Sequence, residues 1–155
     1  MYLLHRMTED TVLTKEEFDE ALELVEEDLG RMGGLDIVQI QRNKNEILHQ
    51  VFSTKSEADK IASKLAEYRL VNELDDLVPG RYIRWISLIN VNCPKLTNGG
   101  IVVDTLMSDK GLYAVCKNKM NRVFQVNMGT SAVFQKMTDS EKLVTSLVEY
   151  ASRNK

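Results

Sequence analysis

Cysteine, proline and glycine are all scarce in this sequence. Its 155 residues include 2 cysteines, 2 prolines and 8 glycines. Two cysteines cannot build a disulfide scaffold, and so little proline and glycine excludes collagen-like and low-complexity chains. No apolar run approaches the roughly 20 residues that a membrane-spanning helix requires. We therefore expect a globular protein with no membrane association, in which Cys93 and Cys116 are free thiols.

Signals for export, metal binding and catalysis are also missing. The apolar run Tyr2–Leu4 is shorter than the roughly 7–15 residues of a secretory signal, so we expect an intracellular protein. The 2 histidines and 2 cysteines do not have the ligand spacing of a zinc site. No phosphate-binding loop or nucleophile motif is present. The sequence predicts no metal, no cofactor and no enzymatic activity.

Negative charge is concentrated in the first half of the chain. The net charge is −3, yet residues 1–77 hold 9 basic and 18 acidic residues, whereas residues 78–155 hold 11 and 5. Such a split indicates that the two halves meet different partners, or each other. The alternative is that acidic helices solvate their outer faces.

Three Thr-x-x-Glu sequences predict helix starts, because the threonine and glutamate side chains can satisfy each other's backbone N–H groups. They are Thr14–Glu17, Thr54–Glu57 and Thr138–Glu141. A stripe of mostly apolar residues with helical spacing follows each of these starts. The first stripe consists of Phe18, Leu22, Val25 and Leu29. The second consists of Ala58, Ile61, Leu65, Tyr68 and Asn72, and the third of Leu143, Val144, Leu147 and Ala151.

The stretch 35–52 fits two structures. As a hairpin it has strands at Ile37–Gln41 and Ile47–Phe52, joined by the polar turn Arg42–Glu46. As a helix, its apolar residues also fall on one side. Two asparagines beside Lys44 are typical of a turn, so we favour the hairpin.

Residues 78–136 have the pattern of short strands closed by turn residues. The predicted strands are Arg81–Leu88, Gly100–Met107, Leu112–Lys117, Arg122–Met128 and Ala132–Lys136. Five strands this close together predict a small antiparallel barrel of the Tudor type. The expected fold is α+β, with an acidic helical part with a β-hairpin at 1–77, the barrel at 78–137, and a C-terminal helix at 138–155 that packs on the core.

The barrel segment is rich in cations and aromatic side chains. Residues 81–136 hold eight basic and two acidic residues. Cations can neutralise phosphates and rings can stack on exposed bases, so this pattern predicts a nucleic-acid-binding surface. The candidate residues are Arg81, Tyr82, Arg84, Trp85, Tyr113, Lys117, Lys119 and Arg122. Two alternatives are an aromatic cage for methyl-lysine, formed by Tyr82, Trp85 and Tyr113, and a purely structural role.

A spaced pattern lies in the segments Leu77–Trp85, Leu96–Val103 and Ala132–Lys136. It reads Gly-x-Tyr-Ile-Arg-aromatic, then Leu, then Gly-Gly, then short strands. In this pattern the chain resembles a module in uncharacterised proteins of large amoeba-infecting DNA viruses, of the marseillevirus-like group. The resemblance implies a viral protein, in the host cytoplasm or packaged in the virion. It implies no activity and carries over no functional residues.

Two functions are therefore expected. The first is a non-enzymatic protein that binds nucleic acid or nucleoprotein through the basic barrel. The second is a structural or adaptor protein that makes protein–protein contacts, for example as a virion component. An exposed basic and aromatic face favours the first, and a large exposed apolar patch favours the second.

Overall fold

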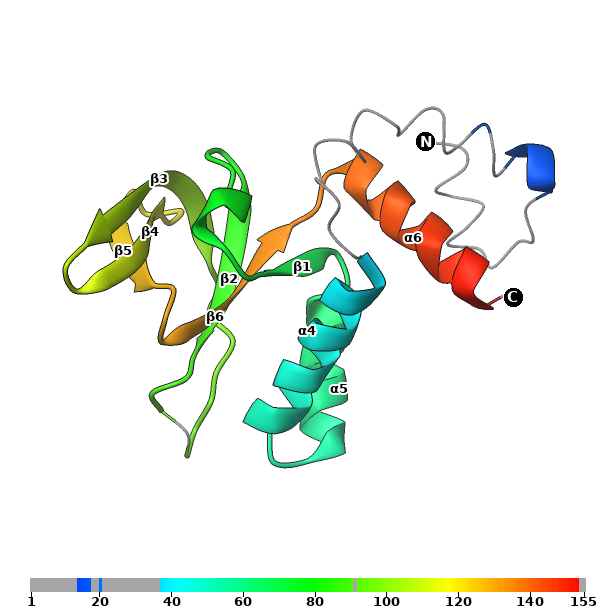
Figure 1. The fold of residues 1–155 in the computed structure, drawn as a ribbon. Coiled ribbons are helices and arrows are strands. Elements are labelled where there is room, and N and C mark those ends of the chain that lie inside the picture. The colour runs from blue at the N-terminus through cyan, green and yellow to red at the C-terminus, as the bar shows by residue number, and fades with distance from the viewer. Residues whose placement is uncertain (1–13, 18–19, 21–36, 91, 154–155) are drawn as a thin grey trace. The chain divides into compact units, whose positions relative to one another are not determined.

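The structure, a computed structural model, describes residues 14–17, 20, 37–90 and 92–153 (Figure 1). The chain divides into two compact units, one of residues 41–136 and the other of residues 1–40 with 137–155. The first unit contains the sheet and every residue of the predicted site. The apolar stripe predicted to begin at Phe18 lies outside the described residues.

Residues 37–51 form one helix, α4 (Ile37–Val51), so the favoured hairpin is wrong. Lys44 and Leu48 are one helical turn apart, and both are buried. The ammonium group of Lys44 donates to the carbonyl oxygens of Leu65 and Tyr68, each at 3.1 Å. The error arose because a lysine that looks like part of a polar turn is satisfied inside the fold by backbone groups 21 and 24 residues away.

The second helix is shorter than predicted. It is α5 (Lys55–Lys64), with Thr54 as the expected N-cap and Leu65 as the C-cap. The chain then enters strand β1 (Tyr68–Val71), so the predicted continuation of the helical stripe to Asn72 is wrong. The physical reason is tertiary, because β1 pairs antiparallel with a strand far ahead in the sequence.

The five strands predicted after residue 80 are confirmed. They are β2 (Tyr82–Ser87), β3 (Gly100–Ser108), β4 (Gly111–Lys117), β5 (Val123–Asn127) and β6 (Ser131–Lys136). With β1 they form an antiparallel six-stranded sheet in the order β1-β6-β2-β3-β4-β5. The sheet has two edges and is open, so the structure does not confirm a closed five-stranded barrel. Because β1 lies before residue 78, the sheet combines a strand from the acidic half of the chain with five strands from the basic half.

Both faces of the sheet bury apolar side chains, as alternation along the strands requires. The cluster under α4 and α5 consists of Leu48, Phe52, Ala58, Leu65, Leu70, Ile86, Ala132 and Phe134. The cluster on the other face consists of Val71, Leu77, Ile83, Val102, Ala114, Cys116, Val126 and Val133. Figure 1 shows α4 and α5 side by side next to β1.

Threonine caps the helix at all three predicted starts. Helix α6 (Asp139–Arg153) belongs to the second unit. Before it, the Glu141 N–H donates to Thr138 Oγ1 at 3.2 Å and the Thr138 N–H donates to Glu141 Oε1 at 3.0 Å. The Glu17 N–H likewise donates to Thr14 Oγ1 at 3.1 Å. Local sequence therefore determines these helix starts.

The described part of the chain contains no helix long and apolar enough to cross a membrane. Both cysteines are free thiols, Cys93 exposed and Cys116 buried. Burial raises the pKa of the Cys116 thiol above its usual value.

Candidate nucleic-acid interface

Strand β2 supplies the first two side chains of the candidate site. Tyr82, Arg84 and Ile86 alternate along the strand and so share one face of the sheet. Ile86 is fully buried in the cluster under the helices. Tyr82 and Arg84 lie outside that cluster and are half-buried. The same strand face therefore carries core at one end and polar, accessible groups at the other.

The ladder between β2 and the chain leading into β3 contains one extra residue. The bridge Ile86↔Leu96 and the pair Ile83↔Gly100 enclose two residues on β2 but three on the opposite side. This is a β-bulge, which needs a backbone conformation suited to glycine. Gly99 has φ +91°, and a Cβ there would lie 2.1 Å from the Ile83 carbonyl oxygen. The bulge thus holds its backbone closely against β2.

The bulge also fixes the side chains of β2. The Tyr82 hydroxyl donates to the Asn98 carbonyl, and Arg84 Nε donates to the Thr97 carbonyl at 2.8 Å. The Trp85 N–H donates to Thr97 Oγ1 at 3.1 Å. Because Arg84 uses only Nε in its bond to the bulge, both Nη groups remain as hydrogen-bond donors.

Strands β1 and β6 add Tyr68 and Lys136, which are direct cross-strand partners. Burial raises the pKa of Tyr68 above its ordinary value of 10.0, and the positive charge of Arg84 opposes that rise. Tyr82 and Glu67 add smaller upward contributions to the same pKa. The rings of Tyr68 and Tyr82 and the Arg84 guanidinium are therefore close enough to interact electrostatically. Lys136 is exposed beside them.

The turn between β4 and β5 provides a second wall. Asn118 Oδ1 organises this turn by accepting the N–H groups of Met120 at 2.9 Å and Arg122 at 3.0 Å. Lys117, Lys119 and Arg122 are all exposed within this one hairpin, as the sequence predicts. The hairpin therefore presents three cations to solvent.

Together these elements line one groove with a cavity volume of about 870 Å³. Its lining residues are Tyr68, Tyr82, Arg84, Trp85, Thr97, Asn98, Gly99, Asn118, Lys119, Met120, Phe124 and Lys136. They include three cations and the rings of Tyr68 and Tyr82, but no carboxylate, histidine or cysteine. Trp85 packs its side chain against the cluster on the other face of the sheet. The cross-strand pair Cys116↔Phe124 places Phe124 on that other face as well. Such a lining can bind anions by charge and flat rings by stacking.

Six of the eight predicted site residues lie in or beside this groove. Tyr82, Arg84, Trp85 and Lys119 line it, and the remaining cations of the hairpin flank it. The pairs Tyr82↔Ile101 and Ile101↔Lys117 place Lys117 in the same cross-strand row as Tyr82. The groove and the hairpin cations therefore form a continuous surface.

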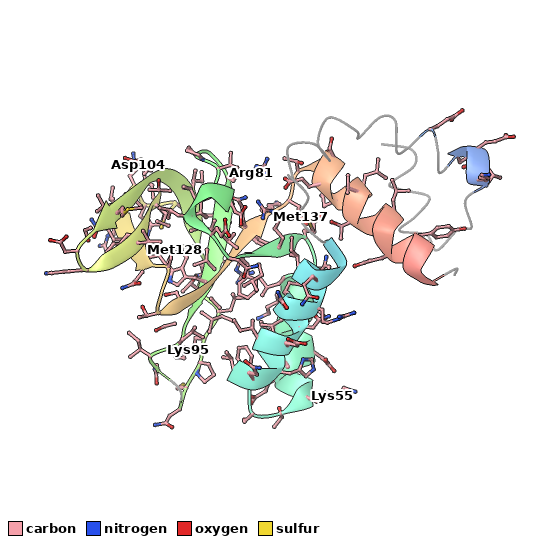
Figure 2. All side chains as sticks on the ribbon, viewed as in Figure 1. Lys55, Arg81, Lys95, Asp104, Met128 and Met137 are labelled. Atoms are coloured by element: carbon pink, nitrogen blue, oxygen red, sulfur yellow. The ribbon has the colours of Figure 1, made fainter. Side chains whose placement is uncertain are left out.

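Arg81 and Tyr113 do not line the groove. Arg81, which is labelled in Figure 2, immediately precedes β2 and is half-buried. Tyr113 is half-buried in the middle of the sheet, paired with Leu106 on β3 and Asn127 on β5. Tyr113 is absent from the lining, and Tyr82 and Trp85 lie on opposite faces of β2, so the three residues do not form an aromatic cage.

Eight lining residues were missed as candidates from the sequence, and Tyr68, Phe124 and Lys136 are the aromatic and cationic ones among them. Tyr68 was missed because its segment was read as helix. Phe124 and Lys136 belong to the basic and aromatic set of residues 81–136, but no local spacing distinguishes them. The strand pairing Tyr68↔Lys136 is the signal that could have found two of them, and it requires knowledge of the sheet order.

Comparisons with protein-family models, with curated proteins and with solved structures find no match to this chain. Within the described ranges, no three His, Cys, Asp or Glu side chains are grouped so that they could hold a metal ion. What the groove can bind therefore follows from its own residues.

Proposed function

We propose that residues 41–136 form a non-enzymatic module that binds nucleic acid or nucleoprotein through the groove. The observation that carries this proposal is the lining, in which Arg84, Lys119 and Lys136 accompany the rings of Tyr68 and Tyr82 and no carboxylate. Cations bind phosphates and rings stack on bases, which together make a binding surface for nucleic acid. A viral setting, in the host cytoplasm or the virion, is part of the proposal and rests on the resemblance alone.

The fixed geometry of the groove supports this proposal. Tyr82 and Arg84 are held by hydrogen bonds to the bulge, so less side-chain entropy is lost when a ligand binds. The exposed Lys117 and Arg122 extend the positive charge along the hairpin. They can make phosphate contacts outside the groove, which increase affinity without sequence preference.

A polarisation titration of the full chain with labelled DNA and RNA, across a salt series, tests the proposal. Each phosphate contact contributes a log–log slope of about −0.9 on duplex DNA and about −0.7 on single strands. Three to five contacts would therefore give a slope between about −2 and −4.5. Absence of binding to any nucleic acid at low salt would refute the proposal.

A charge-reversal pair of variants shows where binding occurs. Changing Lys117, Lys119 and Arg122 to Glu should abolish binding and leave the fold intact, since all three are exposed. The matched control changes Arg42, Lys55 and Lys60, which are exposed on α4 and α5, to Glu. Both variants alter the net charge equally, so equal losses would mean that long-range charge, and not this surface, controls binding.

A second candidate function is a structural or adaptor role, favoured by exposed apolar side chains on the sheet. Ile101, Leu106 and Val123 are 46%, 41% and 62% exposed. Exposed apolar groups of this kind are typical of protein–protein contact surfaces. Sedimentation velocity over a concentration series tests whether the chain self-associates through them. Ile101→Lys with Val123→Lys should then restore the monomer, whereas a chain that is monomeric throughout gives this candidate no support.

A further inference from the structure

We infer that the groove takes an unpaired, single-stranded segment of nucleic acid and discriminates against duplex. This inference rests on the proposed function and specifies its ligand. Three features of the groove carry it: the concave position of its rings, the fixed orientation of its cations, and its free amide groups.

The rings lie inside a concave surface. Tyr68 and Tyr82 are half-buried within the lining. In a duplex the faces of the bases are covered by their stacked neighbours, so recessed rings cannot reach them. An unpaired base can leave the stack and enter the groove to lie against a ring.

The size of the groove agrees with an unpaired segment. Its cavity of about 870 Å³ falls within the range of about 300–1,000 Å³ that small-ligand sites occupy. Individual nucleotides are ligands of this class, whereas a double helix is a convex rod that rests on a surface. Duplex contact would therefore be limited to the cations at the rim.

The cations and amides have complementary positions for such a segment. Arg84 keeps both Nη groups available after its Nε is bound at 2.8 Å by the Thr97 carbonyl. Asn118 uses Oδ1 for two turn N–H groups, which leaves its amide nitrogen as a donor. Asn98 adds a second amide to the lining. Phosphates can be bound by the guanidinium, and the exposed edge of an unpaired base can be bound by the amides.

The test compares four ligands by polarisation at one salt concentration. They are a DNA single strand of about 12 nucleotides, the RNA strand of the same sequence, the corresponding duplex, and an abasic strand of equal length. A length of about 12 nucleotides lies within the range of about 4–16 that one single-strand-binding site usually covers. We expect at least one single strand to bind about tenfold or more tightly than the duplex and the abasic strand.

Two ring variants locate the effect. Tyr82→Leu removes a lining ring but keeps apolar bulk, and it should weaken single-strand binding about fivefold or more with little change for the duplex. Tyr113→Leu is the matched control, because Tyr113 is half-buried in the same sheet outside the groove. It should leave both affinities unchanged.

The outcomes separate this inference from the function on which it rests. Duplex binding as tight as single-strand binding would overturn the inference and leave nucleic-acid binding in place. Equal binding of abasic and normal strands would also overturn it, since bases would then play no part. Failure of every nucleic acid to bind would overturn both proposals.

Discussion

The sheet face that packs under α4 and α5 and the continuation of the same face into the groove differ in kind. Along β6, Phe134 is fully buried against the helices, whereas Lys136, two residues later on the same face, is exposed. Along β2, Ile86 is fully buried and Arg84 is half-buried in the groove. One face of a strand thus changes from buried core to the lining of the groove within a single alternation.

The extent of the helices explains this difference. Helix α5 ends at Lys64 with Leu65 as its C-cap, and the ammonium group of Lys44 donates to the carbonyl oxygens of Leu65 and Tyr68 just beyond that end. Strand residues in contact with the helices are apolar because they are removed from water. The next residues on the same face carry polar tips on long stems, which suit a surface that is only partly covered. The change from apolar to polar residues along one face of a strand therefore indicates where the helices stop covering it.

The largest expected effect comes from the pair Phe134→Ala and Lys136→Ala. The first leaves a large cavity under the helices and should lower the free energy of unfolding by about 3–5 kcal/mol. The second removes an exposed side chain and should change it by less than about 0.5 kcal/mol. Urea unfolding followed by circular dichroism measures both. Similar losses for the two variants would mean that the groove end of the face is also core.

A second pair tests how closely the bulge approaches β2. Gly99→Ala would place a Cβ 2.1 Å from the Ile83 carbonyl oxygen at φ +91°, and should cost about 2–4 kcal/mol. Gly80→Ala has almost the same φ, +92°, but no heavy atom lies within 4 Å of its Cβ. It should cost only about 1 kcal/mol, from backbone strain. Thermal unfolding of both variants separates steric overlap from strain, and equal losses would contradict the close approach.

A third pair tests the point at which the helices end. Lys44→Met keeps the apolar stem but removes the donor for two carbonyl oxygens, and should cost about 1–3 kcal/mol. Arg42→Met, on the exposed side of the same helix, should cost less than about 0.5 kcal/mol. Chemical denaturation of both variants is the measurement. A stabilised Lys44→Met protein would show that burial of the ammonium costs more than its hydrogen bonds return.

The smallest expected effect is a shift in the pKa of Tyr68. The positive charge of Arg84 lowers the pKa of Tyr68, which burial otherwise raises, so Arg84→Gln should move that pKa further upward. Tyrosinate absorbance during an alkaline titration measures it, with Tyr68→Phe to assign the signal. Because the folded pKa exceeds the unfolded value of 10.0, Tyr68 contributes stability that is lost as the pH rises above 10.0. A downward shift in Arg84→Gln would mean that the two groups do not interact.

The sequence predicted those parts of the fold that depend on local chemistry. Threonine caps and alternating strands follow from neighbours a few residues away, and both were found at the right positions. Helix α4 was missed because the burial of Lys44 depends on carbonyls of Leu65 and Tyr68, which local pattern cannot supply. Strand β1 was missed because the spacing of Leu65, Tyr68 and Asn72 also fits a helix. Only pairing with β6 decides between the two.

The candidate site was likewise predictable from the sequence only where its residues are close together in the chain. Tyr82, Arg84 and Trp85 stand out because they occur together in one strand with mixed polarity on both faces. Tyr68 and Lys136 enter the site through strands that are neighbours in the sheet but far apart in sequence. A site formed by residues on neighbouring strands cannot be predicted until the strand order is known.

The bulge makes the groove depend on the length of the chain as well as on its side chains. Three residues oppose two between the flanking pairs, so deletion of Asn98 would leave equal numbers on the two sides and a regular antiparallel ladder. The Tyr82 hydroxyl would lose its carbonyl partner, and the wall of the groove would flatten. Deletion of one residue here would therefore change the groove while every residue of the two buried clusters stays in the chain. The number of residues between Leu96 and Gly100 thus sets the shape of the groove as much as their identity does.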